Sequence, residues 1–75
     1  MEPYKNLNGN SNVASYTIGD DYILVRFMSG RWTDYTYTYS NAGSSDIEAM
    51  KQLARQGYGL NSFISRHKPA YSHKI

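Results

Sequence analysis

The sequence predicts a small α+β domain in which a three-stranded antiparallel meander is followed by two helices packed on one face. Residues 35–39 alternate tyrosine with threonine, which is the period-two pattern of a strand with one aromatic face. Residues 23–27 also alternate, whereas residues 45–68 repeat their apolar positions at helical spacing. Strands followed by helices in a chain of 75 residues indicate one domain of the α+β class.

Three strands are expected between residues 13 and 39. The first covers residues 13–18 and the second residues 23–27, after a turn at Gly19-Asp20-Asp21. The loop Ser29-Gly30-Arg31 then leads into a third strand at about residues 32–39. Short connections of this kind join neighbouring antiparallel strands, so the three segments form a meander.

The length of the loop between the second and third strands determines which side chains share a face. A two-residue turn would set Val25 opposite Asp34 and place polar groups on the aliphatic face. A three-residue loop avoids this, because it brings the aliphatic and aromatic rows to the same side. We therefore expect Val25 opposite Tyr35, Ile23 opposite Tyr37, and Arg26 opposite Asp34 on the outer face.

Two helices are expected after the strands. Ser45 and Glu48 have the spacing of a capping box at the start of the first helix, and Gly57 ends it. Asn61 is the expected cap of the shorter second helix and Pro69 its stop. Neither helix is long enough to be stable alone, so both must pack on the sheet. The expected core is Val13 or Ala14, Ile23, Val25, Phe27, Tyr35, Tyr37, Ile47, Met50, Leu53, Leu60, Phe63 and Ile64.

Composition divides the chain into a folded domain at residues 13–69 and two looser ends. Residues 1–12 are rich in asparagine and lack periodicity, which predicts a disordered segment, and residues 70–75 are expected to form a loose basic tail. The chain has no cysteine, which excludes disulfides and thiolate metal ligands. No signal segment and no long apolar run is recognised, so the expected location is cytoplasmic, without a membrane partner.

Charge is distributed unevenly along the chain. Residues 1–50 carry three basic and six acidic side chains, whereas residues 51–75 carry five basic and no acidic ones. A basic half with interspersed aromatics is a candidate footprint for a polyanion, although a solvated helical face and a loose tail would give the same pattern. The candidate nucleic-acid-binding residues are Lys51, Arg55, Arg66, Lys68, Tyr71 and Lys74.

A second candidate surface lies on the uncovered side of the predicted sheet. Tyr16, Leu24 and Trp32 fall there, where they can meet bases, a second copy of the chain or a partner protein. Tyr35 and Tyr37 are expected beneath the helices, and the alternative is that their rings form a stacking platform for unpaired bases.

The sequence contains no arrangement typical of catalysis. His67 and His73 are not spaced with carboxylates as zinc ligands are, and Asp20-Asp21 suits a turn better than an acid and base pair. Gly57-Tyr58-Gly59 is better explained by one helix ending and the next beginning than by an anion-binding loop. We therefore predict no catalytic residue, metal, cofactor or small-molecule substrate.

Several short motifs together resemble a known family. They are Ser11-Asn12-Val13, Ile18-Gly19-Asp20, residues 24–30, the Tyr-x-Tyr motif, Leu53-Ala54, Gly57, and Asn61 with Ile64. The chain resembles the KTSC family over roughly residues 11–69. That family is a short domain at the C-terminus of some lysyl-tRNA synthetases and also a stand-alone bacterial protein. The resemblance implies a domain of this size with no catalytic motif and a suspected RNA ligand.

These observations predict a non-catalytic binding module whose preferred ligand is RNA, bound through basic residues of the second half. The main alternative is a protein-interaction or homodimerisation module that uses the open sheet face or an edge strand. A purely accessory fold without a ligand is the third reading.

Overall fold

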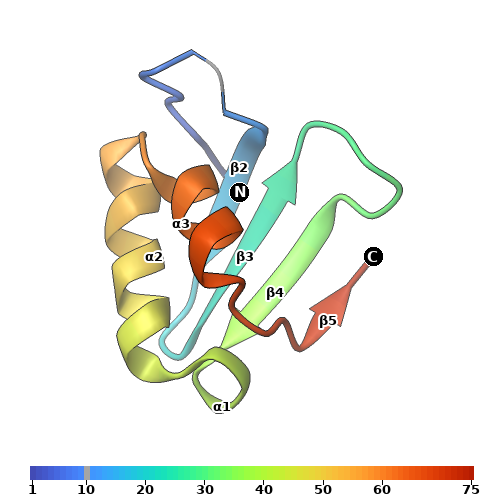
Figure 1. Cartoon of the computed structure of the whole chain (residues 1–75), viewed down its shortest axis with the longest axis vertical. Coiled ribbons are helices and arrows are strands. Elements are labelled where there is room, and N and C mark those ends of the chain that lie inside the picture. Colours follow the sequence, from blue (N-terminus) through green and yellow to red (C-terminus); the bar gives the residue numbers. More distant parts are fainter. Residues whose placement is uncertain (10) are drawn as a thin grey trace.

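An antiparallel sheet forms one layer of the fold and helices form the other, as the computed structural model shows for residues 1–9 and 11–75 (Figure 1). The described residues contain five strands in the order β1-β2-β3-β4-β5 and three helices. The strands are β1 Glu2–Pro3, β2 Val13–Ile18, β3 Tyr22–Phe27, β4 Asp34–Thr38 and β5 His73–Lys74. The helices are α1 Tyr39–Ala42, α2 Ser44–Gln56 and α3 Leu60–His67. The α+β class and the antiparallel sheet are confirmed.

The predicted register of the central strands is also confirmed. Strand β3 pairs with β4 so that Ile23 lies opposite Tyr37 and Val25 opposite Tyr35. Ile23 is fully buried and Tyr37 is only 3% exposed, because α2 and α3 cover this face. The aliphatic and aromatic rows therefore share the helix side of the sheet, as the three-residue loop requires.

The prediction of three strands is wrong, because the described chain adds a short strand at each edge. Glu2 pairs with Tyr16 and Pro3 with Ser15 at one edge, within the segment 1–12 that was expected to be disordered. Tyr4 is buried there, and its hydroxyl accepts a hydrogen bond from the Leu60 backbone N–H at 3.3 Å. Asn10 of the same segment lies outside the described residues.

The tail at residues 70–75 forms the other edge instead of hanging loose. Ser72 donates its backbone N–H to the Thr36 carbonyl at 2.7 Å, and Ile75 and Asp34 exchange two backbone hydrogen bonds of 2.9 Å. Both edge strands have only two residues and lie in polar segments. These strands form through main-chain hydrogen bonds, and the side chains of these segments have no periodicity that would predict a strand.

Both predicted helix starts need correction. Gly43 precedes α2 with φ 90° and ψ 142°, a conformation open mainly to glycine, so the helix begins at Ser44, and no side chain of the described residues caps it. Ser45 therefore lies inside the first turn and cannot form the predicted capping box. Gly59 precedes α3 in the left-handed conformation, so the predicted cap Asn61 is already helical.

The predicted helix ends agree better with the structure. Gly57 closes α2 with φ 87°, as predicted, and its N–H bonds to the Leu53 carbonyl. Helix α3 ends at His67, and Lys68 adopts φ 47° ahead of Pro69, the predicted stop. Helix α1 was not predicted, because Thr38 caps a single turn directly after the strand.

The core lies between the helices and the sheet, and it contains most of the predicted residues. An irregularity between Val13 and Ser15 in β2 admits one extra residue, so that Val13 and Tyr16 both face the helices. Because of the bulge, Val13 and not Ala14 is the core residue of this strand. The bulge also buries Tyr16, which was predicted to lie on the uncovered face of the sheet. The buried apolar set is Tyr4, Val13, Tyr16, Ile23, Val25, Tyr37, Ile47, Met50, Ala54 and Leu60, and the predicted Phe27, Tyr35, Leu53, Phe63 and Ile64 are partly buried against it.

Candidate nucleic-acid interface

A groove of about 560 Å³ lies on the helix side of the sheet, between α3, the β3–β4 loop and the C-terminal segment. Its aromatic lining comes from Phe27, Trp32, Tyr35, Tyr37 and Tyr71, and Arg31 and Lys68 contribute cations. Asn12, Asn61 and Ser65 add polar groups. We call this region the aromatic–basic groove. In Figure 1, α3 lies in front of β2 and β3, and the C-terminal segment runs from α3 past β4 to β5.

The backbone at the groove fixes the positions of its side chains. In the β3–β4 loop, Phe27 donates its N–H to the Thr33 carbonyl at 2.8 Å, which closes the turn that carries Arg31 and Trp32. On the opposite side, Lys74 pairs with Tyr35 across β4 and β5. Cross-strand partners share a face, so Lys74 projects to the helix side, where the groove lies.

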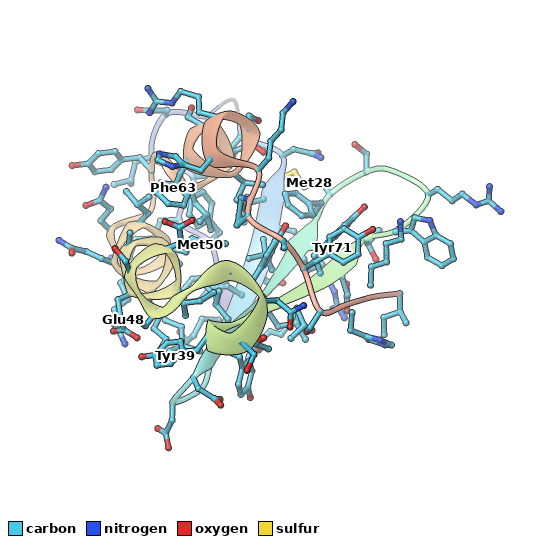
Figure 2. All side chains as sticks on the ribbon, turned by 60° about the horizontal axis from the view of Figure 1, so that its bottom comes forward. Met28, Tyr39, Glu48, Met50, Phe63 and Tyr71 are labelled. Carbon is cyan, nitrogen blue, oxygen red and sulfur yellow. The ribbon has the colours of Figure 1, made fainter. Side chains whose placement is uncertain are left out.

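The aromatic rings form a continuous series from the core to the surface. Tyr37 stacks on Tyr35 with ring centroids 6.4 Å apart, and Tyr35 meets Phe27 edge to face at 5.5 Å. Tyr71 then contacts Tyr35 edge to face at 5.1 Å and is 41% exposed. Figure 2 shows Tyr71 on the C-terminal segment over the sheet, well away from Tyr39 and Glu48. The buried ring of Tyr37 and the half-buried rings of Tyr35 and Phe27 thus support an exposed one.

Cations lie against the exposed rings of the groove. The Lys74 Nζ lies 5.6 Å from the Trp32 ring centroid and 5.1 Å from the Tyr71 centroid. The Arg31 guanidinium lies 5.7 Å from the same Trp32 ring. Hydrogen bonding with the Tyr71 side chain raises the pKa of Lys74, and a lysine is already charged at neutral pH at its ordinary pKa. Cation–π contacts hold it without neutralising its charge.

Two side chains of the sheet have shifted pKa values, one on each face. Desolvation raises the pKa of Tyr37 to about 12, so its hydroxyl stays neutral beneath the groove. On the outer face, Arg26 donates two hydrogen bonds of 2.8 Å to Asp34, which lowers the pKa of that carboxyl. The acidic side chain is thereby paired on the side of the sheet opposite the groove.

The structure brings together three of the six residues predicted to bind nucleic acid. Lys68 and Tyr71 line the aromatic–basic groove and Lys74 lies over two of its rings. Arg55 instead lies in a separate depression beside β2, and Arg66 is exposed on α3 without lining the groove.

Lys51 is misassigned as a nucleic-acid contact. It is only 5% exposed, and its Nζ donates to the Asp20 carbonyl and to the Glu48 carboxylate, both at 2.8 Å. Tyr39 donates its hydroxyl to the same Glu48 carboxylate at 2.5 Å, a contact that lies beside α1 and α2 (Figure 2). This ammonium ties α2 to the β2–β3 turn. The residue type predicted a charge but could not reveal that the charge is buried and paired.

The three residues predicted to share the open sheet face are in fact separated. Tyr16 is buried under the helices, and Leu24 lies half-buried on the outer face. Trp32 is 41% exposed, as expected of a surface residue, but it lines the groove on the helix side. They do not form one surface.

Sequence reasoning did not assign Arg31 or Asn12 to a candidate site, although both line the groove. Arg31 lies in the acidic half of the chain, so a search restricted to residues 51–75 passed over it. Asn12 fell in the segment expected to be disordered. The adjacency of Arg31 and Trp32 was the available signal, because a cation next to an exposed ring suits recognition of a nucleotide.

The histidines and carboxylates of the described residues do not form a metal site. Within residues 1–9 and 11–75, no three histidine, aspartate or glutamate side chains gather as metal ligands do. His67 stacks on Phe63 with centroids 4.1 Å apart. In the part of the chain that the structure describes, no helix is both long and apolar enough to cross a membrane.

Comparison with known proteins gave no match. No family model matches the chain, and no curated protein or solved structure matches it at a significant level. The resemblance to the KTSC family therefore stays a prediction from the motifs quoted above.

Proposed function

We propose that this protein is a non-catalytic binding module for RNA and that the aromatic–basic groove is its binding surface. The observation that carries the proposal is the position of Lys74, whose ammonium lies over two exposed rings, Trp32 and Tyr71. A nucleotide combines a flat base with a charged phosphate, and a groove that combines exposed rings with cations matches both parts.

Electrostatics supports a nucleic acid over a neutral ligand. Arg31, Lys68 and Lys74 supply three cations at the groove, and among the residues that the structure describes no acidic side chain lines it. If each cation neutralises one phosphate of a single strand, the logarithm of the binding constant should fall with the logarithm of salt at a slope of about −2. The predicted cytoplasmic location would give the module access to RNA.

A protein-interaction or homodimerisation role is the rival proposal. The outer face and the edge strands of the sheet provide less support for it than the groove provides for RNA binding. The outer face presents mainly hydroxyl side chains around Leu24 and the Arg26–Asp34 ion pair. The edge strands have two residues each, one of them containing Pro3, which cannot donate to a further strand. Sedimentation over a wide concentration range tests this rival, which requires a concentration-dependent dimer.

A backbone NMR titration with a single-stranded oligoribonucleotide at low salt tests the proposal. We expect amide shifts at Arg31, Trp32 and residues 68–74 that disappear on adding salt, and little change at Lys51 and Arg55. The double variant Lys68→Gln/Lys74→Gln should lose most of the shifts. Arg55→Gln/Arg66→Gln is the control, because it removes the same charge from positions outside the groove. The absence of shifts in the groove, or equal losses in the two variants, would contradict the proposal.

A further inference from the structure

The rings of Trp32 and Tyr71 both line the aromatic–basic groove. Trp32 comes from the β3–β4 loop and Tyr71 from the segment after α3, and each is 41% exposed. Both rings reach the same ammonium, that of Lys74. A group that takes the place of this ammonium therefore lies next to both rings.

Tyr71 is held in place before any ligand arrives. Its ring packs edge to face on Tyr35, whose own ring is supported by Phe27 and Tyr37. The backbone next to it is fixed by the 2.7 Å hydrogen bond from Ser72 to Thr36. A side chain that is already ordered loses little conformational entropy on binding, so stacking on Tyr71 is favoured.

Lys74 can leave the rings without disturbing the fold. Its backbone is fixed by the pairing with Tyr35, but its ammonium is carried on four flexible methylene groups. The same ammonium can therefore turn from the ring faces toward a phosphate while the strand stays paired. Arg31 and Lys68 remain at the groove as further phosphate ligands.

We infer that the groove binds one unpaired base between Trp32 and Tyr71, in the place that the Lys74 ammonium occupies in the free protein. This inference rests on the proposed function and specifies its ligand class as unpaired RNA. Bases within a duplex are stacked and paired, so their faces cannot enter between two protein rings, whereas bases in single strands, loops and bulges can. Base–aromatic stacking also tolerates any base, so the site requires an accessible base face more than a particular sequence.

Trp32 gives a direct readout, because it is the single tryptophan of the chain. The experiment titrates the full-length protein with a single-stranded oligoribonucleotide and, separately, with the same strand annealed to its complement. Trp32 fluorescence reports stacking, and anisotropy of a label on the RNA reports affinity. We expect the single strand to quench Trp32 and to bind about tenfold or more tightly than the duplex.

Two variants of Tyr71 separate stacking from folding and from hydroxyl chemistry. Tyr71→Phe keeps the ring and should retain the affinity within about twofold, whereas Tyr71→Leu removes the ring and should weaken single-strand binding by about five-fold to 150-fold. Thermal unfolding by circular dichroism checks that both variants are folded. The equivalent loss for Trp32→Leu is measured by anisotropy alone.

The outcomes distinguish this inference from the proposed function. Binding that depends on Lys68 and Lys74 without quenching of Trp32, or with equal affinity for duplex and single strand, would overturn the inference and leave the RNA-binding function in place. Failure of either RNA to bind at low salt would overturn both. Quenching by the single strand together with the difference between the two Tyr71 variants supports the unpaired base.

Discussion

Two lysines of this protein have the same charge and opposite surroundings. Lys51 on α2 is buried, and its ammonium is fully engaged by the Asp20 carbonyl and the Glu48 carboxylate. Lys74 on β5 reaches the ring faces of Trp32 and Tyr71 at the edge of an open groove. The first stabilises the fold, and the second is available to a ligand.

The comparison shows that a surplus of basic residues does not by itself locate a binding site. What distinguishes the two regions is the partner of each ammonium. A carboxylate and a carbonyl bind the Lys51 ammonium at 2.8 Å, and the lysine side chain itself is buried, so this ammonium cannot reach a phosphate without giving up both hydrogen bonds. Ring faces hold Lys74 by weaker contacts, which a phosphate can replace. The predictions below test this difference, from the largest expected effect to the smallest.

The largest effect is expected in the core next to Lys51. Met50 on α2 is fully buried, so Met50→Ala should lower the free energy of unfolding by about 2–5 kcal/mol through lost contacts and a cavity. Met50→Leu conserves volume and should cost less than about 1.5 kcal/mol. Urea unfolding measures both values. Similar losses for the two variants would show that this side of the core is not tightly packed.

The second prediction compares the stability and the RNA affinity of Lys51→Ala with those of Lys74→Ala. Lys51→Ala removes the hydrogen bonds to the Asp20 carbonyl and to the Glu48 carboxylate, which keeps Tyr39 as a donor, and should lower the free energy of unfolding by about 1–3 kcal/mol, with the RNA affinity of the folded protein unchanged. Lys74→Ala should change stability by no more than about 0.5 kcal/mol and should weaken RNA binding. Urea unfolding and RNA anisotropy on both variants test this. The comparison fails if Lys51→Ala weakens binding as much as Lys74→Ala does.

The third prediction concerns Tyr37, which lies under the groove and belongs to the core. Its pKa is about 12 in the folded protein and near 10 when the chain is unfolded. Between those values the unfolded chain holds fewer protons than the folded one, so the free energy of unfolding should fall as pH rises from about 10 to 12. Tyr37→Phe should reduce that fall, as measured by urea unfolding at several alkaline pH values. An identical alkaline loss in the variant would show that Tyr37 is not the group responsible.

The smallest change in stability is expected for the Arg26–Asp34 ion pair on the outer face. This pair contacts neither Lys51 nor the groove, so its variant serves as a control for both. Hydrogen bonds from Arg26 lower the pKa of Asp34, so this pair stabilises the fold above the ordinary carboxyl pKa, and the contribution is lost as pH falls through the lowered value. The stability difference between wild type and Asp34→Asn should therefore be larger at pH 7 than near pH 2. RNA binding by Asp34→Asn should match wild type, because the pair lies away from the groove. A constant difference at both pH values would contradict the assignment.

The sequence predicts the parts of this fold that depend on side-chain periodicity. Alternation along β3 and β4, together with the length of the Ser29-Gly30-Arg31 loop, gave the correct partners for Ile23 and Val25. Gly57 gave the correct end of α2, since a left-handed residue closes a helix readily. These features are local, and each has a strong physical preference.

The features that sequence reasoning missed depend on contacts between distant segments. Strands β1 and β5 form through main-chain hydrogen bonds that any sequence can make, and the bulge in β2 buries Tyr16 against simple alternation. The start of α3 is satisfied by the hydroxyl of Tyr4, which lies 56 positions earlier in the chain. No local pattern indicates such partners.

In the candidate site, too, some residues could be predicted from a local pattern and others depend on contacts between distant segments. Lys68, Tyr71 and Lys74 were identifiable as a short basic and aromatic run, and the structure brings them to one groove. Their partners Arg31 and Trp32 lie some forty positions earlier, and only the pairing of β4 with β5 brings the two segments together.

The most direct test of the central claim is the salt dependence of single-stranded RNA affinity in two charge-matched double variants. Wild type and Arg55→Gln/Arg66→Gln should both show a slope of about −2, because neither of those arginines lines the groove. Lys68→Gln/Lys74→Gln should show weaker binding and a slope reduced to about −0.7, which corresponds to the one remaining cation, Arg31. Equal slopes in the two variants, or a loss confined to the arginine variant, would contradict the assignment of RNA binding to the aromatic–basic groove.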